Sequence, residues 1–381
     1  MEYSDFFEAV RRRDNDDIWL ISKIADVHCT DLKNGEISCN PFLSQDFPKN
    51  YMGSEETLET YAIKGKIGCY LTVNGEDYAF DDTALINLAN LAQAGGFITL
   101  LSPKGGQNPV TPEIRAAVLN QATGCFTGHG ENGGKSCKLL FRNDHICTAL
   151  SESYRVYPFK NFLEAAEVEL PKLGATTFES GDISEDYDEA IFQIEDFELE
   201  QKVSSALGVP NAKLYVKLAS GDTGQCAVSI YPMVKAGGDQ ALFGEPMKIK
   251  HDSPRCTDEN IAKNLSAAFS SVQATAEMVE GLKAIPVKHI GGMFKRLAKA
   301  AGLPKKESLQ MAEFLENSPQ KDQFRVWWAL LQILNVWERN TKPSKSALLA
   351  KQEAVFRLIT KTKGHFDAED APFEWEAAKI Q

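Results

Sequence analysis

The sequence predicts an α+β protein with antiparallel hairpins in its N-terminal and central parts and a helical C-terminal third. Turn-forming dipeptides separate short apolar runs as far as about residue 234, which is typical of antiparallel strands. After Thr257 turn signals become sparse and apolar residues recur at the 3.6-residue spacing of helices. A length of 381 residues with a hydrophobic share of 43% allows two or three domains. We therefore expect an N-terminal extension (1–65), an α+β core with an antiparallel sheet (66–256), a helical region (257–362) and an acidic-aromatic tail (363–381).

The first elements are a helix and a hairpin. Ser4 to Arg13 has the pattern of a short amphipathic helix with Ser4 as its cap. No clear signal follows as far as about Thr60. Apolar runs from Lys66 to Phe80 then flank Asn74-Gly75, the dipeptide that supplies the positive φ angles of a type I′ turn.

The remaining elements follow in order along the chain. A helix is expected over Asp81–Gly96, capped by Asp82 or Thr83 and ended by Gly95-Gly96. The next elements are a helix from Pro112 capped by Thr111, strands at 139–141 and 146–150, a helix over 159–170, and a hairpin over 214–234. The C-terminal third should hold a helix after Thr257 and further helices over 292–301, 306–316, 322–339 and 344–360.

Cysteine pattern and hydropathy both fit a cytoplasmic protein. The eight cysteines form no Cys-x-x-Cys pair and lack the ligand spacing of a structural zinc site, so we expect buried or free thiols. No uncharged apolar run is long enough to span a membrane, and the N-terminus lacks the order of a secretory signal. We therefore expect a cytoplasmic protein without membrane contact.

Charge is segregated along the chain. The formal net charge of −12 argues against a protein that coats nucleic acid with its whole surface. The segment from Ser151 to Pro210 contains 14 acidic and 4 basic residues, whereas the segment from Gly281 to Gly364 contains 16 basic and 6 acidic residues. A basic face on an acidic molecule is thus possible.

The strongest functional signal is a basic stretch without any acidic residue from Lys283 to Lys306. Such a field suits phosphate binding, and Gly291-Gly292 would let backbone amides approach a strand. The alternative is a solvated helix face whose cations neutralise the acidic segment from Ser151 to Pro210. A further signal is the tail after Gly364, which combines acidic and aromatic residues and could occupy a basic groove, dock a partner protein, pack or be disordered.

Other patterns do not predict a catalytic site. Gly128 to Ser136 lacks the spacing of a phosphate-binding loop, so we interpret it as an ordinary loop. The acidic residues from Asp182 to Glu189 lack calcium-loop spacing, and we expect a solvated loop. Trp327, Trp328 and Trp337 lie in a segment that is apolar almost all round, which favours a buried helix over a base-stacking platform. We predict no catalytic residue, metal or cofactor.

Three stretches resemble the phage and plasmid proteins known as domain of unknown function nine hundred and thirty-two. Ala149 to Tyr157 resembles their Leu-Ser-x-x-Tyr-Arg block. Ser220 to Val228, followed by His251, is similar to their Ser-x-x-Gly hairpin and strand-then-His segment, and Val326 to Thr341 resembles their Trp-to-Asn-x-x-Thr helix. The resemblance covers roughly 81–360. It departs at Lys235-Ala236-Gly237-Gly238, which stands where the family has Cys-Thr-Asn-Gly.

The resemblance implies a protein of a phage or mobile element, and the hairpin-plus-helix arrangement resembles ring-forming single-strand annealing proteins. The leading hypothesis is an ATP-independent, homo-oligomeric protein that binds and anneals single-stranded DNA in recombination or replication. A structural or host-interaction protein is the main alternative, and a metal-dependent nuclease using carboxylates near Asp182 to Glu189 is the third. The expected DNA-binding residues are Lys288, Lys295, Arg296, Lys299, Lys305 and Lys306, with Arg142 and Arg155 lining the hairpin groove.

Overall fold

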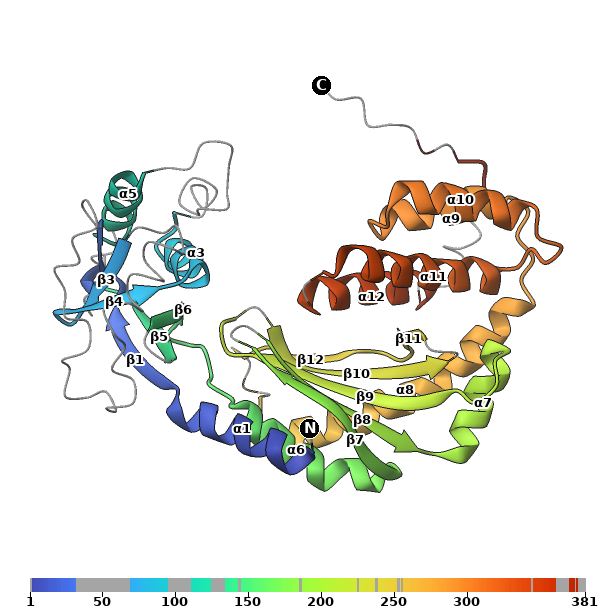
Figure 1. The fold of residues 1–381 in the computed structure, drawn as a ribbon, viewed down its shortest axis with the longest axis horizontal. Coiled ribbons are helices and arrows are strands. Elements are labelled where there is room, and N and C mark those ends of the chain that lie inside the picture. Colours follow the sequence, from blue (N-terminus) through green and yellow to red (C-terminus); the bar gives the residue numbers. More distant parts are fainter. Residues whose placement is uncertain are drawn as a thin grey trace.

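Two β-sheets, one in each of two lobes, organise the chain (Figure 1). The computed structural model describes residues 2–31, 69–94, 111–124, 134–142, 145–184, 187–224, 226–236, 239–251, 254, 256–343, 345–360, 370–373 and 375. The fold class is α+β, as the sequence predicts. No helix in these ranges is long and apolar enough to cross a membrane.

The N-terminal lobe holds a six-stranded sheet in the order β1-β5-β6-β4-β3-β2. Neighbouring strands are antiparallel except for β4 and β6, which run parallel. Two helices, α3 (Asp82–Leu91) and α5 (Pro112–Gly124), complete its described part, and α3 packs on β6. The strands are β1 (Ile18–Lys23), β2 (His28–Asp31), β3 (Cys69–Val73), β4 (Glu76–Phe80), β5 (Ser136–Arg142) and β6 (His145–Ser151), with the 3-10 helix η1 (Ile24–Asp26) after β1.

Local sequence signals explain several of these elements. Asn74 and Gly75 both have positive φ, 54° and 86°, so the type I′ turn of the β3–β4 hairpin is confirmed. Asp81, one residue before the expected cap, accepts a hydrogen bond from the Ala84 amide at 2.8 Å and so begins α3. The expected stop at Gly95-Gly96 lies outside the described residues.

The C-terminal lobe contains a second sheet in the order β11-β10-β9-β8-β7, with β12 also paired to β10. All its pairs are antiparallel. The expected hairpin over 214–234 forms β9 and β10. The strands are β7 (Ala175–Ile183), β8 (Asp188–Glu195), β9 (Lys213–Gly221), β10 (Cys226–Ala236), β11 (Asp239–Leu242) and β12 (Met247–Ile249).

Each face of this sheet carries its own side chains, because residues alternate along a strand. On β9, Leu214, Val216 and Leu218 enter the main core, where α6 (Phe159–Glu169), α7 (Phe197–Leu207) and α8 (Asp258–Lys283) cover the sheet. Tyr215 and Ala219 belong to a smaller core on the opposite face, together with Leu349 and Phe356. Lys217 lies between these two residues in the strand and is buried as well.

Four helices follow α8, as the periodicity predicts: α9 (Ile290–Ala300), α10 (Lys305–Glu316), α11 (Gln323–Thr341) and α12 (Lys345–Thr360). Helix α12 lies over the sheet face opposite α8, and α11, which packs on α8 and α9, reaches that face with its C-terminal end (Figure 1). Trp327 is fully buried and Trp328 and Trp337 pack at the edge of the main core, so the buried-helix interpretation of this segment is confirmed.

The N-terminal segment is part of both lobes. Helix α1 (Tyr3–Asp16) packs on α6 and β7, and β1 directly after it joins the first sheet. The boundary expected at residue 65 therefore coincides with no boundary of either sheet. The expected cap Ser4 lies inside the helix, and Glu2 occupies the N-cap without a side-chain hydrogen bond.

The acidic middle segment differs most from expectation. The residues from Asp182 to Glu189 were expected to form a solvated loop, but Asp182 lies in β7, and Asp188 and Glu189 begin β8 and are buried. Glu185 and Asp186 lie outside the described residues. The 3-10 helix η6 (Leu170–Lys172) leads into β7. The burial of these carboxylates is possible because basic side chains from distant segments pair with them.

Candidate functional site

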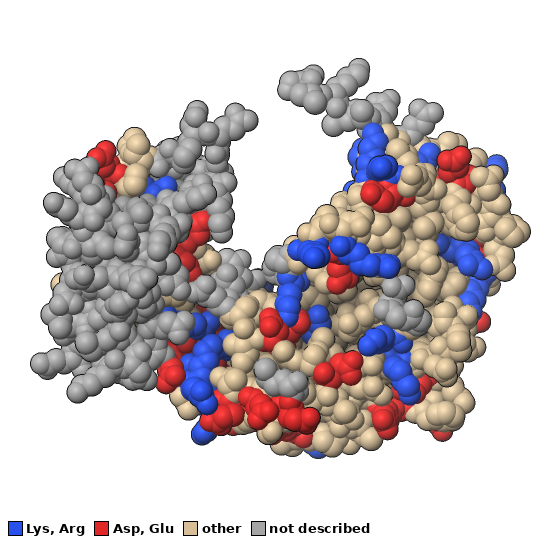
Figure 2. Space-filling view, viewed as in Figure 1, with Lys and Arg blue, Asp and Glu red and all other residues tan. Residues whose placement is uncertain are grey.

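The basic stretch folds into the loop after α8, helix α9 and the start of α10. Apolar residues of α9, among them Met293, Phe294 and Leu297, enter the main core, and its cations therefore lie on the opposite side. Lys288, Lys299 and Lys306 are exposed, whereas Lys295, Arg296 and Lys305 are partly buried. Lys and Arg side chains gather at the edge of the C-terminal lobe where Figure 1 places α9 and α10 (Figure 2).

The five lysines of this surface have no acidic partner among the described residues. The acidic segment from 151 to 210 instead pairs with basic residues outside the stretch from Lys283 to Lys306. Its partners are Arg13, Lys172, Lys213, Lys217, Lys235 and Lys345. The alternative in which the basic stretch neutralises the acidic segment therefore receives no support in the described part of the chain. We call Lys288, Lys295, Arg296, Lys299, Lys305 and Lys306 the α9 surface.

The C-terminal tail docks on the α9 surface. The Asp370 carboxylate accepts hydrogen bonds from the backbone amides of Lys288, at 2.8 Å, and His289, at 2.6 Å. The Phe373 ring lies 5.4 Å from Arg296 Cζ and 5.7 Å from Lys299 Nζ, within cation–π range. A carboxylate and an aromatic ring thus occupy part of a surface that was expected to bind phosphates.

The two glycines of α9 have a different role from the expected one. Both are buried: a Cβ on Gly291 would lie 2.9 Å from the Ala312 carbonyl oxygen, and one on Gly292 would lie 2.4 Å from that of Ala371. Glycine is therefore needed for the close approach of α10 and of the tail. The Gly291 amide donates to Glu316 at 2.9 Å and is not presented to a ligand.

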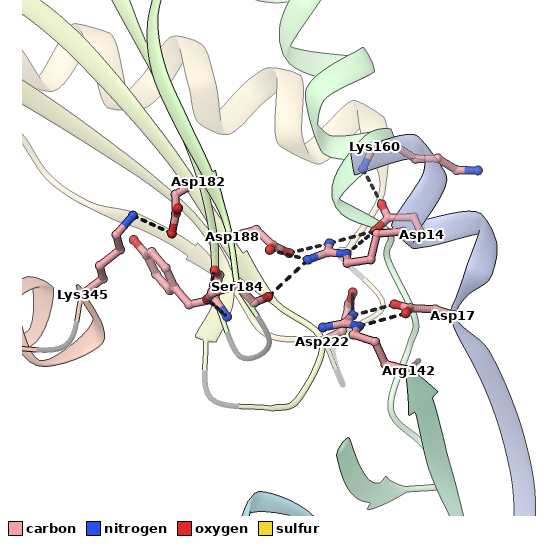
Figure 3. Close-up of polar contacts among 11 residues, drawn as sticks. Asp14, Asp17, Arg142, Lys160, Asp182, Ser184, Asp188, Asp222 and Lys345 are labelled. Atoms are coloured by element: carbon pink, nitrogen blue, oxygen red, sulfur yellow. Dashed lines mark hydrogen bonds and ion pairs between the residues drawn. The ribbon is translucent and has the colours of Figure 1, made fainter. Parts of the chain in front are cut away.

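Arg142 was expected to line a groove, and the structure corrects this. Its side chain is buried at the junction between the lobes, where Nε and Nη2 donate to the two Asp17 oxygens at 2.8 and 2.5 Å. Beside it, Arg13 pairs with Asp188, with Nη2 2.6 Å from Oδ2, and with Asp14 (Figure 3). Arg142 thus joins β5 of the first lobe to the segment after α1, whereas Arg13 joins α1 to β8 of the second lobe.

Asp222, in the β9–β10 turn, completes this junction network. Its Oδ2 lies 3.8 Å from Arg142 Nη2, and its buried Oδ1 has no hydrogen-bond partner among the described residues. Burial, and then the negative charges of Asp14 and Asp17, raise the pKa of Asp222 to about 8. Oxygens of these three carboxylates lie within 4.8 Å of one another, close enough for a cation, but Asp14 and Asp17 already pair with guanidinium groups.

Two of the stretches that carry the family resemblance meet near the junction. The Tyr154 ring stacks on His251 with 4.8 Å between centroids, and the Arg155 amide donates to the His251 carbonyl at 2.9 Å. The side chain of Leu150 packs against Gly224 in the hairpin turn. Arg155 is exposed here, away from α9, so the structure does not bring together all the residues predicted to bind DNA.

A cavity of about 750 Å³ separates the second sheet from the end of α11 and the start of α12. At its floor the buried Lys217 and Glu189 form an ion pair of 3.1 Å. Lys345 Nζ lies 2.7 Å from Glu189 and 2.9 Å from Asp182. Although burial alone raises the pKa of Glu189, the ammonium groups of Lys217 and Lys345 hold it below its ordinary value.

Reasoning from the sequence missed both the junction network and this cavity. Lys217, which stands between Val216 and Leu218 in the interior of the strand Lys213–Gly221, was a usable signal for a polar floor. Asp14, Asp17 and Asp222 carried no such signal, because their convergence depends on the packing of α1 against the second sheet. Comparison with known proteins adds no assignment: no protein-family model, curated protein or solved structure matches this chain.

Proposed function

We propose that this protein binds single-stranded nucleic acid through the α9 surface. The observation that carries the proposal is a set of lysines that lie close together in the chain and have no acidic partner in the described structure. Phosphates would supply the missing anions, and counterion release would supply much of the binding free energy.

The docked tail gives the proposal a second support. Asp370 presents an anion to the backbone before α9, and Phe373 presents an aromatic ring to two cations. A nucleotide offers the same pair of groups, a phosphate and a base with a π-face. Tail and strand would therefore compete for this surface.

The biological setting belongs to the same proposal. Annealing of DNA strands by a homo-oligomer, in the recombination or replication of a phage or mobile element, is proposed from the family resemblance alone, and the cytoplasmic location is proposed from the cysteine pattern and hydropathy. A structural or host-interaction role is the competing function. Light scattering on the purified protein measures the oligomer, and an annealing assay with complementary oligonucleotides measures the activity.

The direct test is fluorescence anisotropy with a labelled single-stranded oligonucleotide at several salt concentrations. Replacing Lys295, Arg296 and Lys299 together by Ala should weaken binding and lower the slope of log affinity against log salt by about 0.7 per lost phosphate contact. The matched control replaces Lys172, Lys202 and Lys235, which also removes three positive charges. Equal loss in both triple variants, or no binding by the wild type at low salt, would contradict the proposal.

The tail provides an opposite perturbation. Phe373→Ala removes the ring from Arg296 and Lys299. The variant should have a higher affinity for the oligonucleotide, because the strand no longer has to displace the ring from these two cations. The control Phe314→Ala removes an aromatic ring that is 69% exposed on α10. Reduced affinity in the Phe373 variant would show that the tail supports the binding surface and does not compete for it. Loss of the oligonucleotide when magnesium is added would reveal the nuclease alternative.

A further inference from the structure

The cavity between the second sheet and helices α11 and α12 has the size and lining of a small-molecule site. Its volume of about 750 Å³ lies within the range of about 300 to 1,000 Å³ typical of ligand pockets. It is hollowed between a sheet face and the turn from α11 to α12, and no residue of the α9 surface lines it. We propose that it binds a phosphate-bearing small molecule of the size of a mononucleotide.

The charges of the cavity favour an anion. Four cations line it, Lys217, Arg339, Lys342 and Lys345, against the two carboxylates Glu189 and Glu338. Asp182, just outside the lining, is a third acidic partner through Lys345, so the local balance is one positive charge. Lys342 pairs with no acidic side chain in the described ranges and stands at the end of α11 in the left-handed conformation, with φ of 44°. A phosphate would give this ammonium group its partner.

The hydrogen-bonding groups favour a ligand that also donates. Gln352 lines the cavity and is 5% exposed, yet its Oε1 has no hydrogen-bond partner among the described residues. A buried acceptor left unpaired costs about 1–3 kcal/mol, so a donor is expected beside it. The amides of Gln240 and Asn335 also line the cavity. A hydroxyl or amino group of a nucleoside meets this requirement, whereas inorganic phosphate fills only the cationic part.

Apolar residues complete the lining. Ile191 and Met233 lie on the sheet side, and Pro343 and Leu348 lie on the helix side. These side chains suit the flat face of a base or another planar group, and the volume excludes a duplex. Two sources share this chemistry: a free nucleotide, and the phosphorylated end of a strand. Ligand binding here does not depend on strand binding at α9.

The test measures binding of defined probes to the full-length protein by titration calorimetry. The probes are dAMP, dTMP, adenosine without phosphate, and inorganic phosphate. We expect the two nucleotides to bind at least about tenfold more tightly than adenosine or phosphate alone, because each of the latter lacks one of the two recognition elements. Equal binding of phosphate and nucleotide, or no binding of either nucleotide at millimolar concentration, would overturn the proposal.

Variants locate the site. Lys342→Ala removes an exposed cation without disturbing the core and should weaken dAMP binding at least about fivefold. Gln352→Leu replaces a buried unpaired amide with an apolar group of similar volume, and should weaken dAMP binding while the melting temperature stays level or rises. Lys306→Ala, on the α9 surface, should leave dAMP binding unchanged. Binding that persists in both cavity variants would place the nucleotide elsewhere and refute the assignment.

Oligonucleotides with and without a 5′ phosphate distinguish the two sources. If Lys342→Ala weakens binding of the phosphorylated oligonucleotide but not of the unphosphorylated one, the ligand is a strand end. If it weakens binding of dAMP but of neither oligonucleotide, the ligand is a free nucleotide. The α9 triple variant separates the two proposals, because it should lose oligonucleotide affinity and retain dAMP binding. Loss of dAMP binding in this variant would contradict the cavity assignment alone, and unchanged oligonucleotide affinity would contradict the α9 proposal alone.

Discussion

Replacing Asp222 by Asn should change how the stability of the protein depends on pH. The pKa of Asp222 is raised from an ordinary 3.8 to about 8 in the folded protein. Between these values the folded state holds a proton that the unfolded chain releases, so the stabilising contribution is complete below pH 4 and is lost as pH rises toward 8. The pKa is raised chiefly by the burial of this carboxylate, whose Oδ1 has no hydrogen-bond partner in the described structure.

The expected magnitude follows from proton linkage. One extra bound proton costs the wild type about 1.4 kcal/mol of unfolding free energy for each pH unit between 4 and 8. An asparagine has the shape of the protonated acid and cannot ionise. The stability difference between Asp222→Asn and wild type should therefore be smallest near pH 4 and should grow by about that amount per unit as pH rises toward 8.

Urea unfolding of both proteins at pH 5, 6, 7 and 8, in buffer containing a chelator, measures this difference. Taking the difference cancels the other carboxylates and histidines that titrate in the same window. An Asn variant whose stability relative to wild type is the same at every pH would show that Asp222 is ionised and stabilised by Arg142, whose Nη2 lies 3.8 Å away. The raised pKa would then be wrong.

Two further predictions concern close packing and buried charge. Gly292→Ala places a Cβ 2.4 Å from the Ala371 carbonyl oxygen, so the substitution should displace the tail. Faster amide hydrogen exchange at residues 370–373 would detect the displacement, and unchanged exchange would refute the prediction. Glu189→Gln leaves Lys217 a buried cation without its carboxylate and should cost about 3 kcal/mol, seen as a lower melting temperature. The control is Glu179→Gln, in an exposed pair with Lys235, which should cost less than about 1 kcal/mol of unfolding free energy. Equal losses of stability in the two variants would contradict the argument from burial.

Local interactions account for what the sequence by itself determined. The turn at Asn74-Gly75, the start of α5 at Pro112 and the five helices after Thr257 each depend on residues a few positions apart. Turn residues and apolar periodicity report such contacts directly. The fold class and the buried nature of α11 follow from the same kind of signal.

The strands β7 and β8 show where local reasoning ended. The acidic residues from Asp182 to Glu189, which belong in part to these strands, indicated a solvated loop, because an acidic residue without a partner nearby in the sequence is expected to lie in water. In the folded chain Arg13 pairs with Asp188 across 175 positions and Lys345 pairs with Glu189 across 156. Those cations allow the carboxylates to be buried, and no residue near the carboxylates in the sequence indicates that such partners exist.

The sites depended on tertiary structure for the same reason. The sequence identified the basic stretch, but only the fold shows that α9 turns its apolar side inward and receives Asp370 from about 80 residues away. Asp14, Asp17 and Asp222 converge because α1 crosses between the lobes, and the cavity exists because α11 and α12 cover one sheet face. Segments distant in the chain meet only once the apolar faces of helices and sheets have packed, so the charges and cavities between them are set by that packing.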